Sequence, residues 1–365
     1  MSSGTVIIIA GILVATACAL LGAFLVLRKM SMMADAISHA ILPGLVAGFF
    51  FANGPNLLAG FLGAALASLL TVSLVEAIQK SGRVGGDSAI GIVFPAMFAL
   101  GTALVSRFFA NVHLDADAIL YGNIEFSAHD TLLINGVSFG PQSFWVMGTL
   151  LMINLAFITL FYKELKLATF DPGLATTLGF SPIAIHYGLM IVVSLTAVGA
   201  FTAVGAVLTV ALMIVPAATA YLLTHQLKAM IGLAALIGAL SAILGYYLAV
   251  AVDTSIAGAI TTVAGLLFGL TLIFSPTQGV IARMIQLQRQ RLYFATETLV
   301  IHLNTHENTA AAETESRIDH LTKELRWKPD FAQRIVQNAL QKEYVVRTNG
   351  HLALTDAGRE FAEKE

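Results

Sequence analysis

The sequence predicts an all-α polytopic membrane protein with about nine transmembrane helices, followed by a small α+β domain outside the membrane. Two observations support this prediction. The 365 residues are 57% hydrophobic and only 12% charged, whereas about 25% of the residues in an average soluble protein carry charge. The charges are also unevenly placed, because 10 of the 22 acidic and 8 of the 20 basic residues precede residue 275. We therefore expect the first three quarters of the chain in lipid and the last quarter in water.

The apolar part divides into segments long enough to cross a bilayer, which takes roughly 20 residues. Nine segments qualify: 5–27, 31–52, 56–78, 88–109, 143–162, 183–199, 202–223, 229–251 and 255–274. The weakest division separates 183–199 from 202–223, because Gly199-Ala-Phe201 is a poor helix breaker. Eight spans and one re-entrant helix therefore remain an alternative.

The basic residues in the short loops predict the orientation. Seven of them follow odd-numbered spans, and only Arg107 lies near the opposite side; the seven are Arg28, Lys29, Lys80, Arg83, Lys163, Lys166 and Lys228. Because Lys and Arg collect in cytoplasmic loops, we expect the N-terminus outside and the C-terminal tail in the cytoplasm. The chain is then a multi-pass protein of the inner (plasma) membrane.

The tail has a different pattern. A helix is expected over 283–303, and apolar residues recur with helical spacing over 315–325 and 330–343. Residues 344–354 alternate around an Asn-Gly turn, which is typical of a β-hairpin, and Thr355 is placed to cap a last helix. The order helix, helix, hairpin, helix is the outline of a winged-helix domain.

These patterns predict three parts: a transmembrane domain at 1–280, a helical linker at 281–314 and a cytoplasmic winged-helix-like domain at 315–365. The residues after 274 hold 12 basic and 12 acidic side chains. This balance lacks the positive footprint of a nucleic-acid-binding domain. It favours a protein-contact or metal-sensing role for the tail over binding to nucleic acid.

Asp35 and His39 are the most informative pair of the apolar part. Ionisable groups at membrane depth are costly and usually functional. Residues at i and i+4 share one helix face, so both side chains can reach one ion, and a carboxylate with an imidazole suits Zn²⁺, Mn²⁺ or Fe²⁺. Counted from Arg28 and Lys29, the pair is expected roughly 10–16 Å from the cytoplasmic boundary. The alternative is a buried polar pair that locks two helices together.

Two ligands on one helix make an incomplete metal site. Ser38 is a candidate for a supporting hydrogen bond, as neighbouring groups often orient metal ligands. His186 is a candidate further ligand, although a single histidine is more often structural. We expect the remaining ligands on other helices or on a second subunit. No permanently bound cofactor is predicted, and the metal ion is expected as transported cargo.

The loop at 163–182 is amphipathic and long for a connection between spans. Asp171-Pro172 can start a helix and Gly179 can end one. A short helix parallel to the membrane is what a docking element for a soluble ATPase would need, and an interfacial helix without a partner is the alternative. The chain has no Gly-rich phosphate-binding loop of the Walker type. If ATP powers this protein, another chain binds and hydrolyses it.

The motif Asp35-Ala-Ile-Ser-His39-Ala-Ile-Leu-Pro-Gly44 resembles the signature of the permeases of metal-ion ABC importers for zinc, manganese and iron. Further matches lie along residues 5–280; they are Asp87-Ser-Ala-Ile-Gly-Ile-Val-Phe94, Tyr121-Gly-Asn123, Phe170-Asp-Pro with Gly179, 204–219, and 263–268 with Phe274-Ser-Pro276. The resemblance implies that Asp35 and His39 contact the metal in transit. It also implies that 163–182, with Phe170, Asp171, Pro172 and Gly179, is the coupling helix seated on the ATPase.

The resemblance implies an assembly: two permease chains, identical or paralogous, on two ABC ATPase subunits, with an extracytoplasmic metal-binding protein delivering the ion. The segment 339–359 resembles the winged-helix part of metal-dependent repressors, but their metal ligands do not match residue by residue. Two other functions stay open. One is a gradient-driven secondary metal transporter with Asp35 and His39 as a proton relay. The other is a membrane-anchored metal-responsive regulator.

Overall fold

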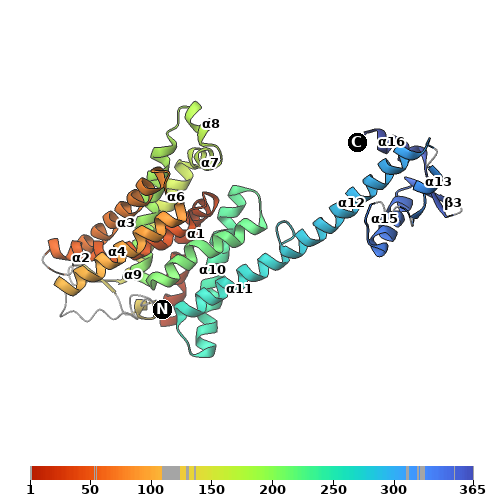
Figure 1. Cartoon of the computed structure of the whole chain (residues 1–365). Coiled ribbons are helices and arrows are strands. Elements are labelled where there is room, and N and C mark those ends of the chain that lie inside the picture. Colours follow the sequence, from red (N-terminus) through yellow and green to blue (C-terminus); the bar gives the residue numbers. More distant parts are fainter. Residues whose placement is uncertain are drawn as a thin grey trace. The chain divides into compact units, whose positions relative to one another are not determined.

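The computed structural model describes residues 2–52, 54, 56–108, 124–128, 131–134, 137–309, 312–318, 320, 325–348 and 350–364. The chain forms two compact units, Met1–Gln278 and Gly279–Glu365. Figure 1 shows the elements of both units. Residues 1–278 are called unit 1, and residues 279–365 are called unit 2.

Unit 1 is a bundle of long apolar helices. Eight helices in the described part of the chain are long and apolar enough to cross a membrane. They are α1 (Ser3–Leu27), α2 (Ser31–Phe51), α3 (Leu57–Lys80), α4 (Gly86–Phe108), α6 (Gln142–Leu160), α9 (Pro182–Leu223), α10 (Leu227–Val252) and α11 (Ile256–Phe274). The prediction of a polytopic helical membrane protein is confirmed.

Shorter elements connect these helices. They are the 3-10 helix η1 (Ile124–Ala128), the antiparallel strands β1 (Thr131–Ile134) and β2 (Val137–Pro141), α7 (Tyr162–Phe170) and α8 (Pro172–Thr177). The sequence analysis did not expect the β1–β2 hairpin. Residues Tyr121–Asn123, which carry part of the family resemblance, lie outside the described residues.

Helix α9 contains both of the segments expected at 183–199 and 202–223. Its break is at Gly205, where φ is +81°, and not at 199–201. Both ends of α9 lie near the end of the bundle that holds α7. His186 contacts Arg28, whose guanidinium donates to Thr169 of α7, and Lys228, just after α9, lies over the ring of Tyr162. The two parts, roughly 34 Å and 27 Å long at 1.5 Å per residue, therefore lead away from that end and back to it.

The core of unit 1 surrounds α1, against which α6, α9 and α10 pack. Small residues allow this close approach, as is usual between membrane helices. A Cβ at Gly22 would overlap the carbonyl oxygen of Met213 in α9, and one at Gly44 would overlap the carbonyl of Gly63 in α3. The buried amide of Asn154 adds a polar connection, because it donates to the carbonyl of Ala17 (3.0 Å) and accepts from Thr196 (3.1 Å).

Unit 2 contains α12 (Val280–His306), α13 (Ala312–Glu315), α15 (Pro329–Gln341), β3 (Val345–Thr348), β4 (His351–Leu354) and α16 (Asp356–Lys364). Strands β3 and β4 form the predicted antiparallel hairpin. Thr355 caps α16 as predicted, because its hydroxyl accepts a hydrogen bond from the Gly358 amide at 3.0 Å. The predicted helix over 315–325 falls partly on residues outside the described part.

The border between the units differs from the expected division into three parts. The sequence analysis expected a separate linker at 281–314, but α12 belongs to unit 2 by its packing. Leu299, Val300 and Leu303 of α12 are buried in one apolar core with Ile335 of α15 and Leu352 of β4. The sequence analysis expected a helix at 283–303, and the apolar stripe of α12 places this helix in the core of unit 2.

Candidate metal-translocation site

Helix α2 places Asp35 and His39 side by side on one face. The helix begins at Ser31, so the two residues lie in its second and third turns. The Oδ1 atom of Asp35 and the Nε2 atom of His39 are 3.6 Å apart. Two ligand atoms bound tetrahedrally to one Zn²⁺ are separated by roughly 3.4 Å, given bond lengths near 2.1 Å. The pair is therefore spaced to hold one divalent ion together.

The face that carries the pair is open in the single chain. The side chains of Asp35 and His39 are 38% and 25% exposed, whereas Ala34, Ala36, Ile37 and Ser38 beside them are buried. The alternative of a buried pair that locks two helices together therefore does not describe these side chains in the single chain. Their open face leaves room for further ligands from outside this chain.

Aromatic rings from α4 hold the imidazole of His39 in place. Phe94 lies edge-on to the ring at 4.5 Å between centroids, and Phe98 lies edge-on at 5.6 Å. Packed rings of this kind restrict the rotation of the imidazole without using either of its nitrogens. The sequence analysis did not identify these phenylalanines as neighbours of the site.

The depth of the pair differs from the expected 10–16 Å. Helix α1 ends at Leu27 and α2 begins at Ser31, so Arg28, Lys29 and Met30 form a turn and add no helical rise. Counted from the start of α2, Asp35 and His39 lie roughly 6 Å and 12 Å along the helix axis. The pair thus lies nearer to this end of α2 than the sequence suggested.

Ser38 does not face the pair. Its side chain is buried, and its hydroxyl donates to the carbonyl oxygen of Ala34 at 3.0 Å within α2. This is the usual back-bonding of serine in an apolar helix. The structure gives Ser38 a role within its own helix and shows no hydrogen bond from it to Asp35 or His39.

His186 belongs to a second polar cluster, at the end of the bundle near α7. Its Nε2 atom contacts Glu76 Oε1 of α3, and its Nδ1 atom lies 3.4 Å from Arg28 Nη1. The other Glu76 oxygen accepts from the Tyr187 hydroxyl at 2.8 Å and from Lys80 at 3.1 Å. Among the described residues, no hydrogen bond or ion pair joins this cluster to Asp35 or His39.

The cluster occupies both nitrogens of the His186 ring. Burial lowers the pKa of Arg28, but a guanidinium stays protonated in proteins and can only donate hydrogen bonds. We infer that Nδ1 of His186 accepts from Arg28 and that Nε2 carries the proton donated to Glu76. In this arrangement neither nitrogen offers a lone pair to a metal ion.

The loop after α6 forms two short helices. Helix α7 ends at Phe170, and α8 begins at Pro172 with Asp171 as its cap, because Asp171 Oδ1 accepts from the Leu174 amide at 2.9 Å. Gly179 follows α8 with φ of +85°, a conformation that glycine adopts without strain. The predicted starting and ending residues of this helix are confirmed.

The surface of α8 and its flanks is apolar and exposed. Phe170, Leu174 and Leu178 are each about half exposed. On its other side this region joins the bundle, because Arg28 Nε donates to Thr169 Oγ1 at 3.1 Å. Arg28 precedes α2 by only three residues, so this hydrogen bond places α7 next to the turn that leads to Asp35.

The chain is similar to proteins that have been named for transport. Residues 5–275 match the ABC 3 transport family. The zinc transport system membrane protein TroD of Treponema pallidum is 45% identical over 98% of this chain and 97% of its own length. The manganese transport system membrane protein MntD of Bacillus subtilis is 45% identical over 80% of this chain and 99% of its own length.

A solved structure shows the same fold. PsaBC from Streptococcus pneumoniae, in complex with Fab, has a TM-score of 0.66 and 30% identity, covering 79% of this chain and 96% of that one. The likeness extends over a share of the chain similar to that of unit 1.

Proposed function

The chain belongs to the ABC 3 transport family, and from this premise we propose that it is the permease subunit of an ABC importer that moves Mn²⁺, Zn²⁺ or Fe²⁺ into the cytoplasm. The observation that carries the proposal is the pairing of Asp35 with His39 at 3.6 Å on the open face of α2. Relatives named for zinc and manganese transport support the class of ion. Carboxylate and imidazole together accept these ions without fixing the choice among them.

We propose that a second permease chain, identical or paralogous, covers the open face of α2. Two protein ligands leave at least half of the coordination positions of a divalent ion unfilled. A second α2 facing the first would supply another carboxylate and another imidazole, and waters would complete the shell. Transport requires that this binding stay weak enough for the ion to be released.

ATP hydrolysis is assigned to separate ABC ATPase subunits that dock on α7 and α8. The exposed apolar side chains of Phe170, Leu174 and Leu178 provide the surface, and the Asp171 cap and Gly179 fix the shape of α8. Thr169 and Arg28 connect this surface to the turn before α2. Movement of α8 on the ATPase would therefore be passed to the helix that carries Asp35 and His39.

The remaining partners follow from the same assembly. We propose that the protein spans the cell (inner or plasma) membrane with its N-terminus outside, where an extracytoplasmic binding protein delivers the ion. Unit 2 would lie in the cytoplasm as a winged-helix-like domain. Its balanced charge favours contact with protein or metal over nucleic acid.

The test is metal uptake by proteoliposomes that contain this chain, its partner permease and the ATPase subunits. Wild-type complex should accumulate ⁵⁴Mn²⁺ or ⁶⁵Zn²⁺ only with ATP and the binding protein present. Asp35→Ala and His39→Ala should each reduce uptake by at least about tenfold, because each removes a ligand to the ion. His225→Gln, an exposed histidine outside the site, is the matched control and should transport normally.

The outcomes separate the three functions. Normal uptake by both Asp35→Ala and His39→Ala would refute the site. Uptake driven by an ion gradient without ATPase subunits would identify a secondary transporter. No uptake by wild-type complex in any condition, with assembly intact, would favour a membrane-anchored regulator.

A further inference from the structure

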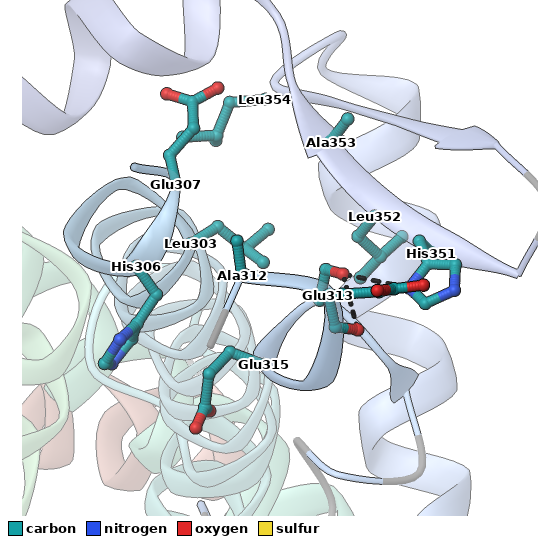
Figure 2. A pocket seen from close by; sticks show the side chains of 11 residues that line it. Leu303, His306, Glu307, Ala312, Glu313, Glu315, His351, Leu352, Ala353 and Leu354 are labelled. Carbon is teal, nitrogen blue, oxygen red and sulfur yellow. Dashed lines mark hydrogen bonds between the residues drawn. The ribbon is translucent and has the colours of Figure 1, made fainter. Parts of the chain in front are cut away.

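A group of metal-ligating side chains lies in unit 2, separate from α2. His302 and His306 stand one turn apart on α12, and Glu315 ends the short helix α13. One ligand atom from each of the three lies within 4.8 Å of the other two. Among the described residues, no other trio of His, Cys, Asp or Glu side chains comes this close. Figure 2 shows His306 and Glu315 directed to the same side, with His351 on the other side of α13.

The distances within this cluster fit shared binding of one ion. His302 Nε2 is 3.2 Å from Glu315 Oε2, close to the roughly 3.4 Å between two ligands of a tetrahedral zinc site. The rings of His302 and His306 are 4.8 Å apart between centroids. His320 Nε2 lies 3.0 Å from the same Glu315 oxygen, so a further imidazole adjoins the carboxylate.

Two atoms of the cluster lack the hydrogen bonds that burial normally requires. His302 Nε2 and Glu315 Oε2 are shielded from solvent, and their mutual approach does not have the alignment of a hydrogen bond. The large majority of buried side-chain polar atoms are hydrogen-bonded in folded proteins. A cation between them would satisfy the carboxylate oxygen and the nitrogen lone pair together.

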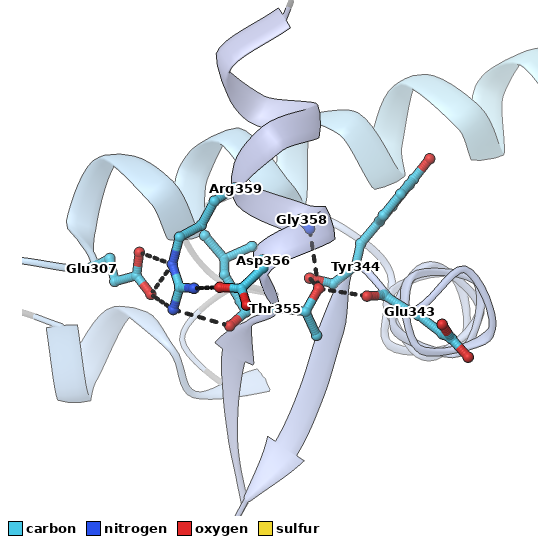
Figure 3. Close-up of polar contacts among 8 residues, drawn as sticks. Glu307, Glu343, Tyr344, Thr355, Asp356, Gly358 and Arg359 are labelled. Carbon is cyan, nitrogen blue, oxygen red and sulfur yellow. Dashed lines mark hydrogen bonds and ion pairs between the residues drawn. The ribbon is translucent and has the colours of Figure 1, made fainter.

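Rigid contacts hold both sides of the cluster in place. At the end of α12, Arg359 Nε and Nη2 donate to the carboxylate of Glu307 at 2.9–3.1 Å (Figure 3). Beside α13, the carbonyl of Ser316 accepts from the Leu352 amide of β4 at 3.0 Å, and the Ser316 hydroxyl lies 3.0 Å from His351 Nδ1. Both ligand-bearing segments are thus fixed on the β3–β4 hairpin and α16.

We propose that His302, His306 and Glu315 form a binding site for a divalent transition metal, with Zn²⁺ as the best-matched ion. Two imidazoles and one carboxylate with an open fourth position are a common zinc ligand set. Mn²⁺ prefers oxygen ligands, so it should bind this nitrogen-rich site more weakly. His320 Nε2 adjoins the same Glu315 oxygen and would help to orient the carboxylate. The site is independent of Asp35 and His39, and its existence does not rest on the transport function.

The test is zinc binding by the full chain in lipid nanodiscs, with Asp35→Ala and His39→Ala present throughout to remove the site on α2. After chelator treatment, this chain should bind one Zn²⁺ in competition with a fluorescent zinc indicator. Glu315→Gln and His306→Gln should each lower the affinity at least about tenfold. Glu313→Gln removes an exposed carboxylate from the same short helix, so it is the matched control and should bind as before.

A ligand exchange distinguishes loss of a ligand from loss of the fold. His306→Cys keeps a metal ligand at this position, so it should still bind Co²⁺, with a thiolate-to-metal absorption band that the parent chain lacks. Equal zinc affinity of Glu315→Gln and Glu313→Gln would overturn the proposal. So would a parent chain that binds no Zn²⁺, or a Co²⁺ spectrum of His306→Cys without the thiolate band; either result would leave the cluster as ion-paired side chains only.

Discussion

Asp35 and His39 show how far residue spacing alone predicts this site. The i, i+4 spacing predicts a shared face for any helix, and the structure places the two ligand atoms 3.6 Å apart. Spacing could not predict that Ser38 bonds to its own helix, because a buried serine hydroxyl takes whichever acceptor lies nearest. Nor could it predict the partners of His186, which come from segments 110 and 158 residues away in the sequence.

The cluster around Glu76 should be structural, and its stability can be measured. Glu76→Ala leaves the Tyr187 hydroxyl and the proton of His186 Nε2 without their acceptor in a partly buried place. We expect a loss of about 2–3 kcal/mol in the free energy of unfolding. Reversible unfolding in mixed detergent micelles, followed by tryptophan fluorescence, measures this loss.

Lys80→Ala is the control for that experiment. It removes a partner of the same carboxylate, but the lysine side chain is 68% exposed, and exposed ion pairs contribute at most about 1 kcal/mol. If Glu76→Ala were no more destabilising than Lys80→Ala, the cluster would not have the structural role proposed for it.

At the scale of the elements, two glycines of α9 have different roles, and only their backbone conformations distinguish them. The sequence analysis placed the break of α9 at 199–201, but Gly199 is helical, and a Cβ there would overlap Leu150 of α6. Gly199 therefore serves close packing, whereas Gly205, with φ of +81°, makes the break. Both roles select glycine, so sequence alone could not tell them apart. Helix α8 was predictable because its cap, first residue and terminating glycine lie within one short segment.

A substitution at Gly179 tests whether the shape of the chain after α8 matters for coupling to the ATPase. Gly179→Val places a β-branched residue at φ of +85°, which is strained, and should change the shape of the surface after α8. We expect ATPase activity of the reconstituted complex to lose its stimulation by the binding protein, while basal ATPase activity remains. Phosphate release with and without binding protein and metal measures the coupling.

Gly350→Val is the matched control for Gly179→Val. Gly350 has nearly the same φ, +87°, in the turn between β3 and β4 of unit 2. A valine there should be similarly strained, but at a position far from α8 in the sequence. Full stimulation in Gly179→Val, or equal loss in both variants, would count against docking of the ATPase at α8.

At the scale of the whole molecule, composition predicted a lipid-embedded part and a water-exposed part of the chain. It did not predict the exact bounds of the two units. Charge density separates the chain near residue 275, and the structure divides it at Gln278 and Gly279. The structure differs from the linker expected at 281–314 because α12 has an apolar stripe that packs on α15. The sequence analysis did not predict the cluster of His302, His306 and Glu315 in unit 2. His302 and Glu315 come together only through the fold, across a turn.

Unit 2 should be dispensable for the transport step itself. The family match ends at residue 275. MntD, which is named for manganese transport, aligns over 99% of its own length but over only 80% of this chain. A chain ending at Gln278 should therefore keep at least partial uptake in the proteoliposome assay, at matched amounts of assembled complex. Complete loss of uptake by an assembled, truncated complex would give unit 2 an essential part in transport.

The central claim is that Asp35 and His39 meet the ion in a water-accessible path, and thiol labelling tests it most directly. Cys18, the one cysteine of the chain, is buried, so Cys18→Ala provides the background. In the assembled complex, His39→Cys should react with a charged methanethiosulfonate reagent, and Cd²⁺ should slow this reaction by binding the thiolate and Asp35. Ser38→Cys, one residue away on the buried side of α2, should not react. A His39→Cys chain as unreactive as Ser38→Cys would place the pair in lipid or dry packing and contradict the account.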